Sequence, residues 1–121
     1  MELLFSFVLA LALTHELDAV RAREWRVLPV LNALSEESGR AAFIAAHVPL
    51  FWLILDGCWS ADAETRDVWR IAVAGFGPIH FGLHWLFREH PYYDFSSQLS
   101  QGLIIGYGVL GALYVGLAFA I

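Results

Sequence analysis

The chain has 121 residues, of which 59% are hydrophobic and 16% are charged, whereas soluble domains average roughly 45–50% apolar and 25% charged residues. Its formal net charge of −5 excludes nucleic acid as a partner, because binding to phosphates needs a basic surface. The length allows a single domain, residues 1–121, and the positive mean hydropathy of +0.60 indicates that this domain lies in a lipid bilayer.

The first apolar segment, residues 3–13, is too short to cross a bilayer, which needs about 20 helical residues. We therefore expect a helix over residues 2–24 that continues through His15, Glu16 and Asp18. Polar residues inside a spanning helix usually face the bundle interior or water. The chain begins without the basic segment of a signal peptide, so this helix is expected to be retained.

Three further apolar blocks follow along the chain. A second helix is expected over residues 41–59, interrupted by His47, and a third over residues 68–88 with Pro78 near its middle. A fourth helix over residues 98–121 carries no charge. These blocks are too long for strands and do not alternate as strands do. The sequence therefore predicts an all-α fold, an integral membrane four-helix bundle.

The distribution of arginine predicts how this bundle is oriented. The first and third connections together hold five arginines, whereas the side with the termini and the middle loop holds two. Because cytoplasmic loops carry an excess of basic residues, both termini are expected on the same, periplasmic side. We predict a multi-pass protein of the bacterial inner membrane, in which the lipid bilayer is the first partner.

Histidines recur at one depth of the predicted bundle. At about 1.5 Å per residue, His15 lies roughly 9 Å from the cytoplasmic end of its helix and His47 roughly 10 Å. By the same count, His80 and His84 lie roughly 12 Å and 6 Å from the end of the third helix. Three helices thus bring imidazoles to nearly the same level.

These side chains match the donors of a metal site in a helical bundle. His80 and His84 share a face at i and i+4, and Asp18 follows His15 at i+3. Zinc enzymes use three protein ligands and an open position, and non-haem iron often uses two histidines and a carboxylate. We predict a divalent metal, zinc or iron, held by four histidines, with Glu16 or Asp18 as ligand or general base. The predicted ligands are His15, His47, His80 and His84.

The leading hypothesis is therefore a membrane-embedded metal-binding protein, and its catalytic form would be a small metalloenzyme that acts on a membrane-soluble substrate. An alternative is a non-catalytic accessory subunit, or a homo-oligomer, that packs through the glycine-rich fourth helix, where Gly102 and Gly106 share a face. A second alternative is a haem-binding electron carrier that uses His47 with His80 or His84, although the neighbouring carboxylates suit a porphyrin poorly. Whether the protein is an enzyme is left open.

The charged stretch after the first helix has a simpler interpretation. Residues 21–26 alternate in charge, and Arg21 is placed to pair with Asp18 and with Glu24 at three-residue spacing. We interpret this stretch as a solvated helix end beneath anionic lipid headgroups.

Several motifs together resemble those of small bacterial membrane proteins named for an HXXEE motif. They are Thr14-His15-Glu16-Leu17-Asp18-Ala19-Val20, His47-x-Pro49-Leu50-Phe51 and His80-x-x-x-His84. The resemblance implies a four-helix membrane fold and no established activity. The chain departs from the motif itself, because Asp18 stands where the first glutamate would be and Ala19 replaces the second.

Overall fold

The computed structural model describes residues 1–120, which form four long helices. Two short 3-10 turns, η1 and η2, lie between the first and second helices, and the described residues contain no strand. The prediction of an all-helical, four-helix chain is confirmed. In chain order the elements are α1 (Glu2–Arg21), η1 (Glu24–Arg26), η2 (Leu31–Ala33), α2 (Glu36–Cys58), α3 (Ala63–Phe87) and α4 (Gln98–Ala120).

Polar caps set where α2 and α3 begin. The side chain of Ser35 accepts a hydrogen bond from the backbone N–H of Ser38 at 3.2 Å, which starts α2 earlier than the apolar pattern predicted. Asp62 accepts from the N–H of Thr65 at 2.8 Å and starts α3 in the same way. Both helices therefore begin in charged sequence, one turn or more before their apolar segments.

The end of α1 also differs from the prediction. The helix stops at Arg21 rather than at Glu24, because Arg23 takes a left-handed conformation with φ 54° and ψ 50°. Such a conformation cannot continue a right-handed helix. The chain turns at this residue, and η1 returns toward the bundle.

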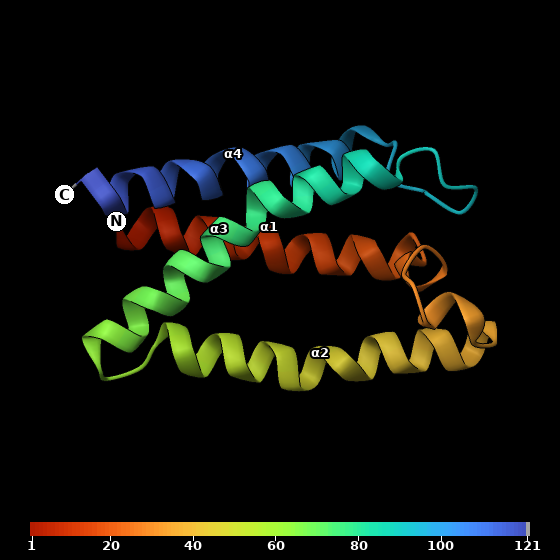
Figure 1. Cartoon of the computed structure of the whole chain (residues 1–121), viewed down its shortest axis with the longest axis horizontal. Helices are drawn as coiled ribbons and strands as arrows, with labels where there is room; N and C mark the ends of the chain where they lie inside the picture. Colours follow the sequence, from red (N-terminus) through yellow and green to blue (C-terminus); the bar gives the residue numbers. More distant parts are fainter. Residues whose placement is uncertain (121) are drawn as a thin grey trace.

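The helices α1, α3 and α4 form a closely packed group, and α2 stands apart from α1 and α4 but contacts α3 (Figure 1). The most extensive contact joins α3 to α4, and α1 packs along α4. Glycines allow the approach of α3 to α4: a Cβ atom on Gly77 would lie 2.5 Å from the carbonyl oxygen of Tyr107. α3 crosses the bundle diagonally, from the end of α2 to α4 (Figure 1).

Two buried clusters form the core. One lies in the half of the bundle nearest the termini, which we call the terminal half, and the other lies toward the connections that follow α1 and α3, in what we call the histidine half. The terminal-half cluster contains Phe5, Val8, Leu9, Cys58, Val73, Ala74, Tyr107 and Tyr114. The histidine-half cluster contains Ala19, Ala22, Trp25, Phe43, Phe95 and Ile104.

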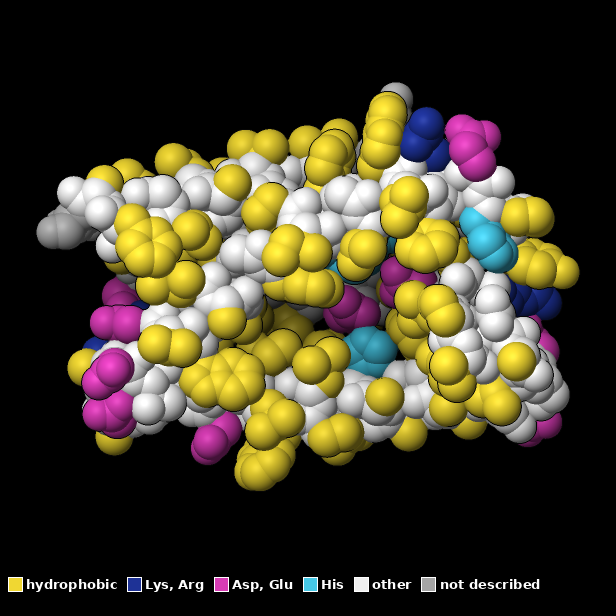
Figure 2. All heavy atoms as spheres, viewed as in Figure 1, with side chains coloured by type: hydrophobic (Ala, Val, Ile, Leu, Met, Phe, Trp, Pro, Cys, Tyr) yellow, Lys and Arg dark blue, Asp and Glu magenta, His cyan; other side chains and the backbone are white. Residues whose placement is uncertain are grey.

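Three helices, α1, α2 and α4, are long and apolar enough to cross a membrane. α3 does not meet this criterion, whereas the sequence predicted four spans. Its polar residues Arg70, His80 and His84 are nevertheless buried, each less than 10% exposed. Figure 2 shows hydrophobic side chains spread over the face of the molecule, with most of the charged ones toward its two ends.

Candidate metal centre

Four side chains from three elements converge in the histidine half. His15 comes from α1, His80 and His84 come from α3, and Glu24 comes from η1. One ligand atom from each of these residues lies within 4.8 Å of all the others. The three histidines are buried. We call these four residues the three-His–Glu group, and they could hold a metal ion.

The spacing of the nitrogens is that expected for ligands of one ion. The Nε2 atom of His84 lies 3.1 Å from Nε2 of His80 and 3.3 Å from Nε2 of His15. Oε1 of Glu24 lies 3.7 Å from the same His84 atom. Imidazole nitrogens bound tetrahedrally to zinc at about 2.0–2.1 Å are separated from one another by about 3.3–3.4 Å.

Hydrogen bonds alone cannot account for these contacts. A ring nitrogen of a neutral imidazole has one in-plane position, which holds either a proton or a lone pair. Nε2 of His84 can therefore form one good hydrogen bond, yet it faces the Nε2 atoms of both His15 and His80. The single in-plane direction of this nitrogen can point at only one of the two, so the other contact is not a good hydrogen bond. A shared cation would turn these three lone pairs into ligands.

Glu24 reaches the group because of the turn at Arg23. Its side chain is 14% exposed, and burial raises the pKa of this carboxyl to about 7, with the neighbouring Glu16 carboxylate adding to the effect. A buried carboxylate is costly unless a cation or hydrogen-bond donors offset its charge. A metal ion at the three-His–Glu group would provide that compensation.

Residues of the α3–α4 connection close the group from one side. The hydroxyl of Tyr93 lies 3.1 Å from Nδ1 of His84, as a partner that would orient the ring. The ring of Phe95 is buried, with its centroid 4.6 Å from that of His84 and 5.5 Å from that of His15. Gln101 donates to the carbonyl oxygen of Phe95 at 2.5 Å and holds this residue in place.

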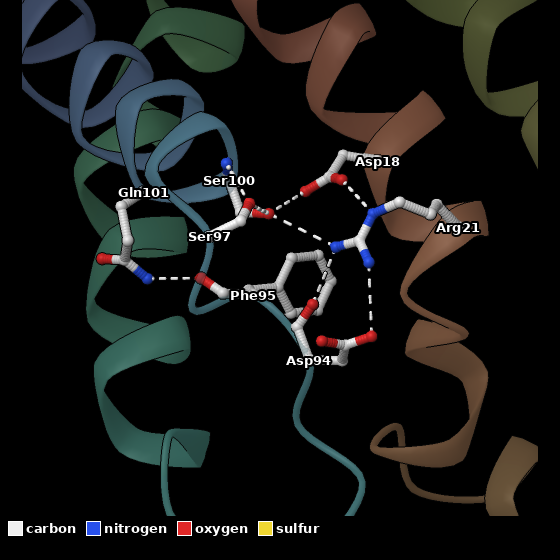
Figure 3. A network of polar contacts seen from close by, with 7 residues as sticks. All are labelled: Asp18, Arg21, Asp94, Phe95, Ser97, Ser100 and Gln101. Carbon is white, nitrogen blue, oxygen red and sulfur yellow. Dashed lines mark hydrogen bonds and ion pairs between the residues drawn. The ribbon is translucent and has the colours of Figure 1, made fainter.

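Asp18 belongs to a separate network that anchors the same connection (Figure 3). Its carboxylate accepts from Nε of Arg21 and from Oγ of Ser100, both at 2.6 Å. Arg21 also donates to the carbonyl oxygen of Asp94 at 2.8 Å and contacts its carboxylate at 3.2 Å. The network therefore ties α1 to the start of α4 and to the residue before Phe95.

His47 and Glu16 form a second polar pair. Nε2 of His47 lies 2.8 Å from Oε2 of Glu16, and Nδ1 of His47 lies 2.6 Å from the carbonyl oxygen of Phe43. His47 is on α2, the helix that stands apart, whereas Glu16 is on α1. The pair therefore bridges the space between these two helices.

One cavity of about 360 Å³ joins the two polar groups. It is lined by Glu16 and His47, by Glu24, His80 and His84, and otherwise mainly by apolar residues of α2, α3 and the two connections. Figure 2 shows acidic and histidine side chains inside a hollow that hydrophobic side chains surround. A volume of this size is typical of small-molecule sites.

The structure brings together three of the four predicted metal ligands. His15, His80 and His84 share the three-His–Glu group, whereas His47 lies outside it and pairs with Glu16. Asp18 has no place in this group, and its two oxygens bond to Arg21 and Ser100. Metal binding by these residues stays a prediction.

Sequence reasoning missed Glu24. The expectation that residues 21–26 form a solvated helix end fails at this residue, because the chain reverses at Arg23 and buries the side chain. Arg21 contacts Asp18 as predicted, and its other acidic partner is Asp94 rather than Glu24. The alternating charges gave no signal of the reversal.

The chain belongs to a family of unknown function, DUF6713, whose model matches residues 1–120. No curated protein and no solved structure matches the chain. The relationship to HXXEE-motif proteins stays a prediction from the motifs around His15, His47 and His80.

Proposed function

We propose that this protein binds a divalent metal ion within a membrane, through His15, His80, His84 and Glu24. The observation that carries the proposal is the convergence of three imidazole Nε2 atoms at 3.1–3.3 Å around His84. Hydrogen bonding can satisfy only one of the two contacts of His84 well, whereas both contacts suit the coordination sphere of one ion.

Zinc and iron are the metals that this donor set favours. Nitrogen and carboxylate ligands suit zinc, and histidines with one carboxylate suit non-haem iron. The rings of His15, His80 and His84 contact one another edge-on, with centroids 4.6–5.0 Å apart. This packing leaves no plane for a porphyrin among them and supports a single ion over haem.

The membrane placement rests on the three apolar helices. We infer that α3 crosses with them, because Arg70, His80 and His84 turn inward and leave it an apolar outer surface. The connections that follow α1 and α3, which hold most of the arginines, would then face the cytoplasm. In this arrangement the metal group lies inside the cytoplasmic leaflet of a bacterial inner membrane.

The test is elemental analysis of protein purified in detergent without exposure to a chelator or a nickel column. About one equivalent of zinc or iron per chain is expected, as for a site with three histidines. His84→Ala should lose it, whereas His90→Ala, outside the three-His–Glu group, should keep it. A folded, monodisperse protein without metal would overturn the proposal.

A second candidate, an accessory or self-associating subunit, is supported by the outer face of α4. Nothing lies within 4 Å of a Cβ atom built on Gly102 or Gly116, so this face is open to a partner helix. Gly106 instead faces Leu11 inside the bundle. Cross-linking in membranes at Gly102→Cys would give a dimer, or a stoichiometric partner, if this face is an interface.

A further inference from the structure

The His47–Glu16 pair contains a proton that can be assigned by its contacts. The carbonyl oxygen of Phe43 can only accept, so Nδ1 of His47 must donate to it at 2.6 Å. A neutral His47 then has a lone pair on Nε2, which would face an oxygen of Glu16 at 2.8 Å. These contacts hold both side chains in fixed positions between α1 and α2. The pair is therefore a fixed polar group that can hydrogen-bond to a further molecule.

The His47–Glu16 pair and the three-His–Glu group open into the same cavity. A molecule inside it can touch both polar groups with one end, while its remainder contacts apolar side chains such as Leu50, Phe76 and Leu83. The cavity lies between α2 and the helices α1 and α3, at the level of segments that we place in the bilayer. We therefore expect its occupant to enter from the lipid phase.

The charge of the lining limits the polar end of that occupant. Glu16 and Glu24 bring carboxyl groups to the cavity, and none of its lining residues is an arginine or a lysine. With a divalent cation at the three-His–Glu group, these two carboxylates balance its charge, so a phosphate or carboxylate headgroup would find no net positive charge. A hydroxyl or a carbonyl group can bond to His47 and Glu16 without a countercharge.

We propose that the cavity binds one neutral single-chain lipid, of the fatty alcohol or monoacylglycerol kind. Its apolar chain lies between α2 and α3, and its hydroxyl or carbonyl group bonds to the His47–Glu16 pair beside the three-His–Glu group. The proposal rests on the membrane placement given above, and it names the class of molecule that a metal at that group would meet.

The first test is photo-cross-linking in lipid nanodiscs with a fatty alcohol that carries a diazirine in its chain. Peptide mapping should place the cross-links on cavity-lining residues of α2 and α3. A matched diazirine fatty acid should label these residues less. Equal labelling by the fatty acid would overturn the neutral headgroup, and labelling spread evenly over the outer surface would overturn the site.

A matched pair of variants separates the cavity from the rest of α2. Ala46 lines the cavity, whereas its neighbour Ala45 does not. Ala46→Trp should reduce labelling at least about tenfold, equivalent to 1.4 kcal/mol of binding free energy. Ala45→Trp should leave the labelling unchanged. Equal labelling of the two variants would contradict the proposal.

Metal content distinguishes failure of this inference from failure of the proposed function. Ala46→Trp and His47→Gln leave the three-His–Glu group in place, so both should keep their metal. His47→Gln should weaken labelling by the fatty alcohol, because glutamine cannot contact both the carbonyl oxygen of Phe43 and Glu16 as the imidazole does. Loss of labelling with metal retained supports the lipid site, whereas unchanged labelling in both variants refutes it and leaves metal binding standing.

Discussion

The two halves of the bundle bury polar groups in different ways. In the terminal half, buried polar groups bond to partners within the chain: Arg70 donates to the carbonyl oxygen of Cys58 at 3.0 Å and pairs with Glu2, and Tyr107 donates to the carbonyl oxygen of Val73 at 2.6 Å. In the histidine half, three imidazoles face one another with more nitrogen atoms than hydrogen bonds can satisfy.

The difference shows which half is complete in itself. Buried polar groups in native proteins are almost always paired, and exceptions call for an explanation such as an ion. The terminal half needs no bound ion, because aromatic and aliphatic packing surrounds its few polar groups, which are hydrogen-bonded within the chain. The proposed cation and cavity occupant would complete the histidine half, so changes to the two halves should separate metal binding from stability.

The largest effect is expected from His84→Ala. His84 contacts His15, His80 and Glu24, so its loss removes the atom around which the group is arranged. Metal affinity should fall by more than about 100-fold, since loss of an outer-shell partner alone costs 10–100-fold. Titration with zinc under competition from a chelator measures it. If His84→Ala keeps its affinity for zinc, the histidine half does not bind metal through this group and the contrast with the terminal half fails.

Tyr93→Phe should have the next largest effect. It removes the hydroxyl that bonds to Nδ1 of His84 and leaves the ring in place. Metal affinity should fall by about 10–100-fold with little loss of fold. Tyr92→Phe is the matched control, because Tyr92 is 56% exposed and its ring lies beside His90, outside the three-His–Glu group. Equal affinities for the two variants would show that the hydroxyl does not orient His84.

Gly77→Ala tests the close contact that joins α3 to α4. A Cβ atom at this position would lie 2.5 Å from the carbonyl oxygen of Tyr107, so the helices must separate. We expect a loss of about 1–3 kcal/mol in the free energy of unfolding. Gly82→Ala, with nothing within 4 Å, should gain up to about 1 kcal/mol. Denaturation by an ionic detergent gives both values, and similar values would contradict the packing.

The smallest effect is expected from Val8→Ala in the terminal half. Val8 is fully buried, and its truncation should cost about 1–2 kcal/mol of stability through lost packing. Metal affinity of the folded protein should not change. Val48→Ala makes the same change at a residue that is 72% exposed, and it should leave both quantities unaltered. A shift in metal affinity at Val8 would show that the two halves are coupled.

Four helices and three members of the three-His–Glu group could be predicted from the sequence. Apolar runs have the length of membrane spans, and depth along a helix follows from counting residues, which brought His15, His80 and His84 to one level. The depth of a residue along its helix, however, does not fix where that helix lies relative to the others. His47 lies on α2, which stands apart from α1 and α4, and its imidazole meets Glu16 instead of the other histidines.

Glu24 lay beyond prediction for a different reason. Its position depends on a left-handed backbone at Arg23, and arginine is not a residue that signals such a turn. Val30, also in this connection, has a positive φ of 73° without glycine's freedom. Local preferences therefore gave no indication of how the chain between α1 and α2 folds, and only tertiary contacts fix it.

The wide separation of the ligands along the chain has a consequence for biogenesis. His15 and His84 are 69 residues apart, so His15 and Glu24 have no histidine partner until α3 has been made and inserted. A metal captured then would link the earliest and later parts of the chain, and at 100 times its dissociation constant it would favour the assembled state by about 2.7 kcal/mol. Metal supply during synthesis would thus act as a checkpoint on completed insertion.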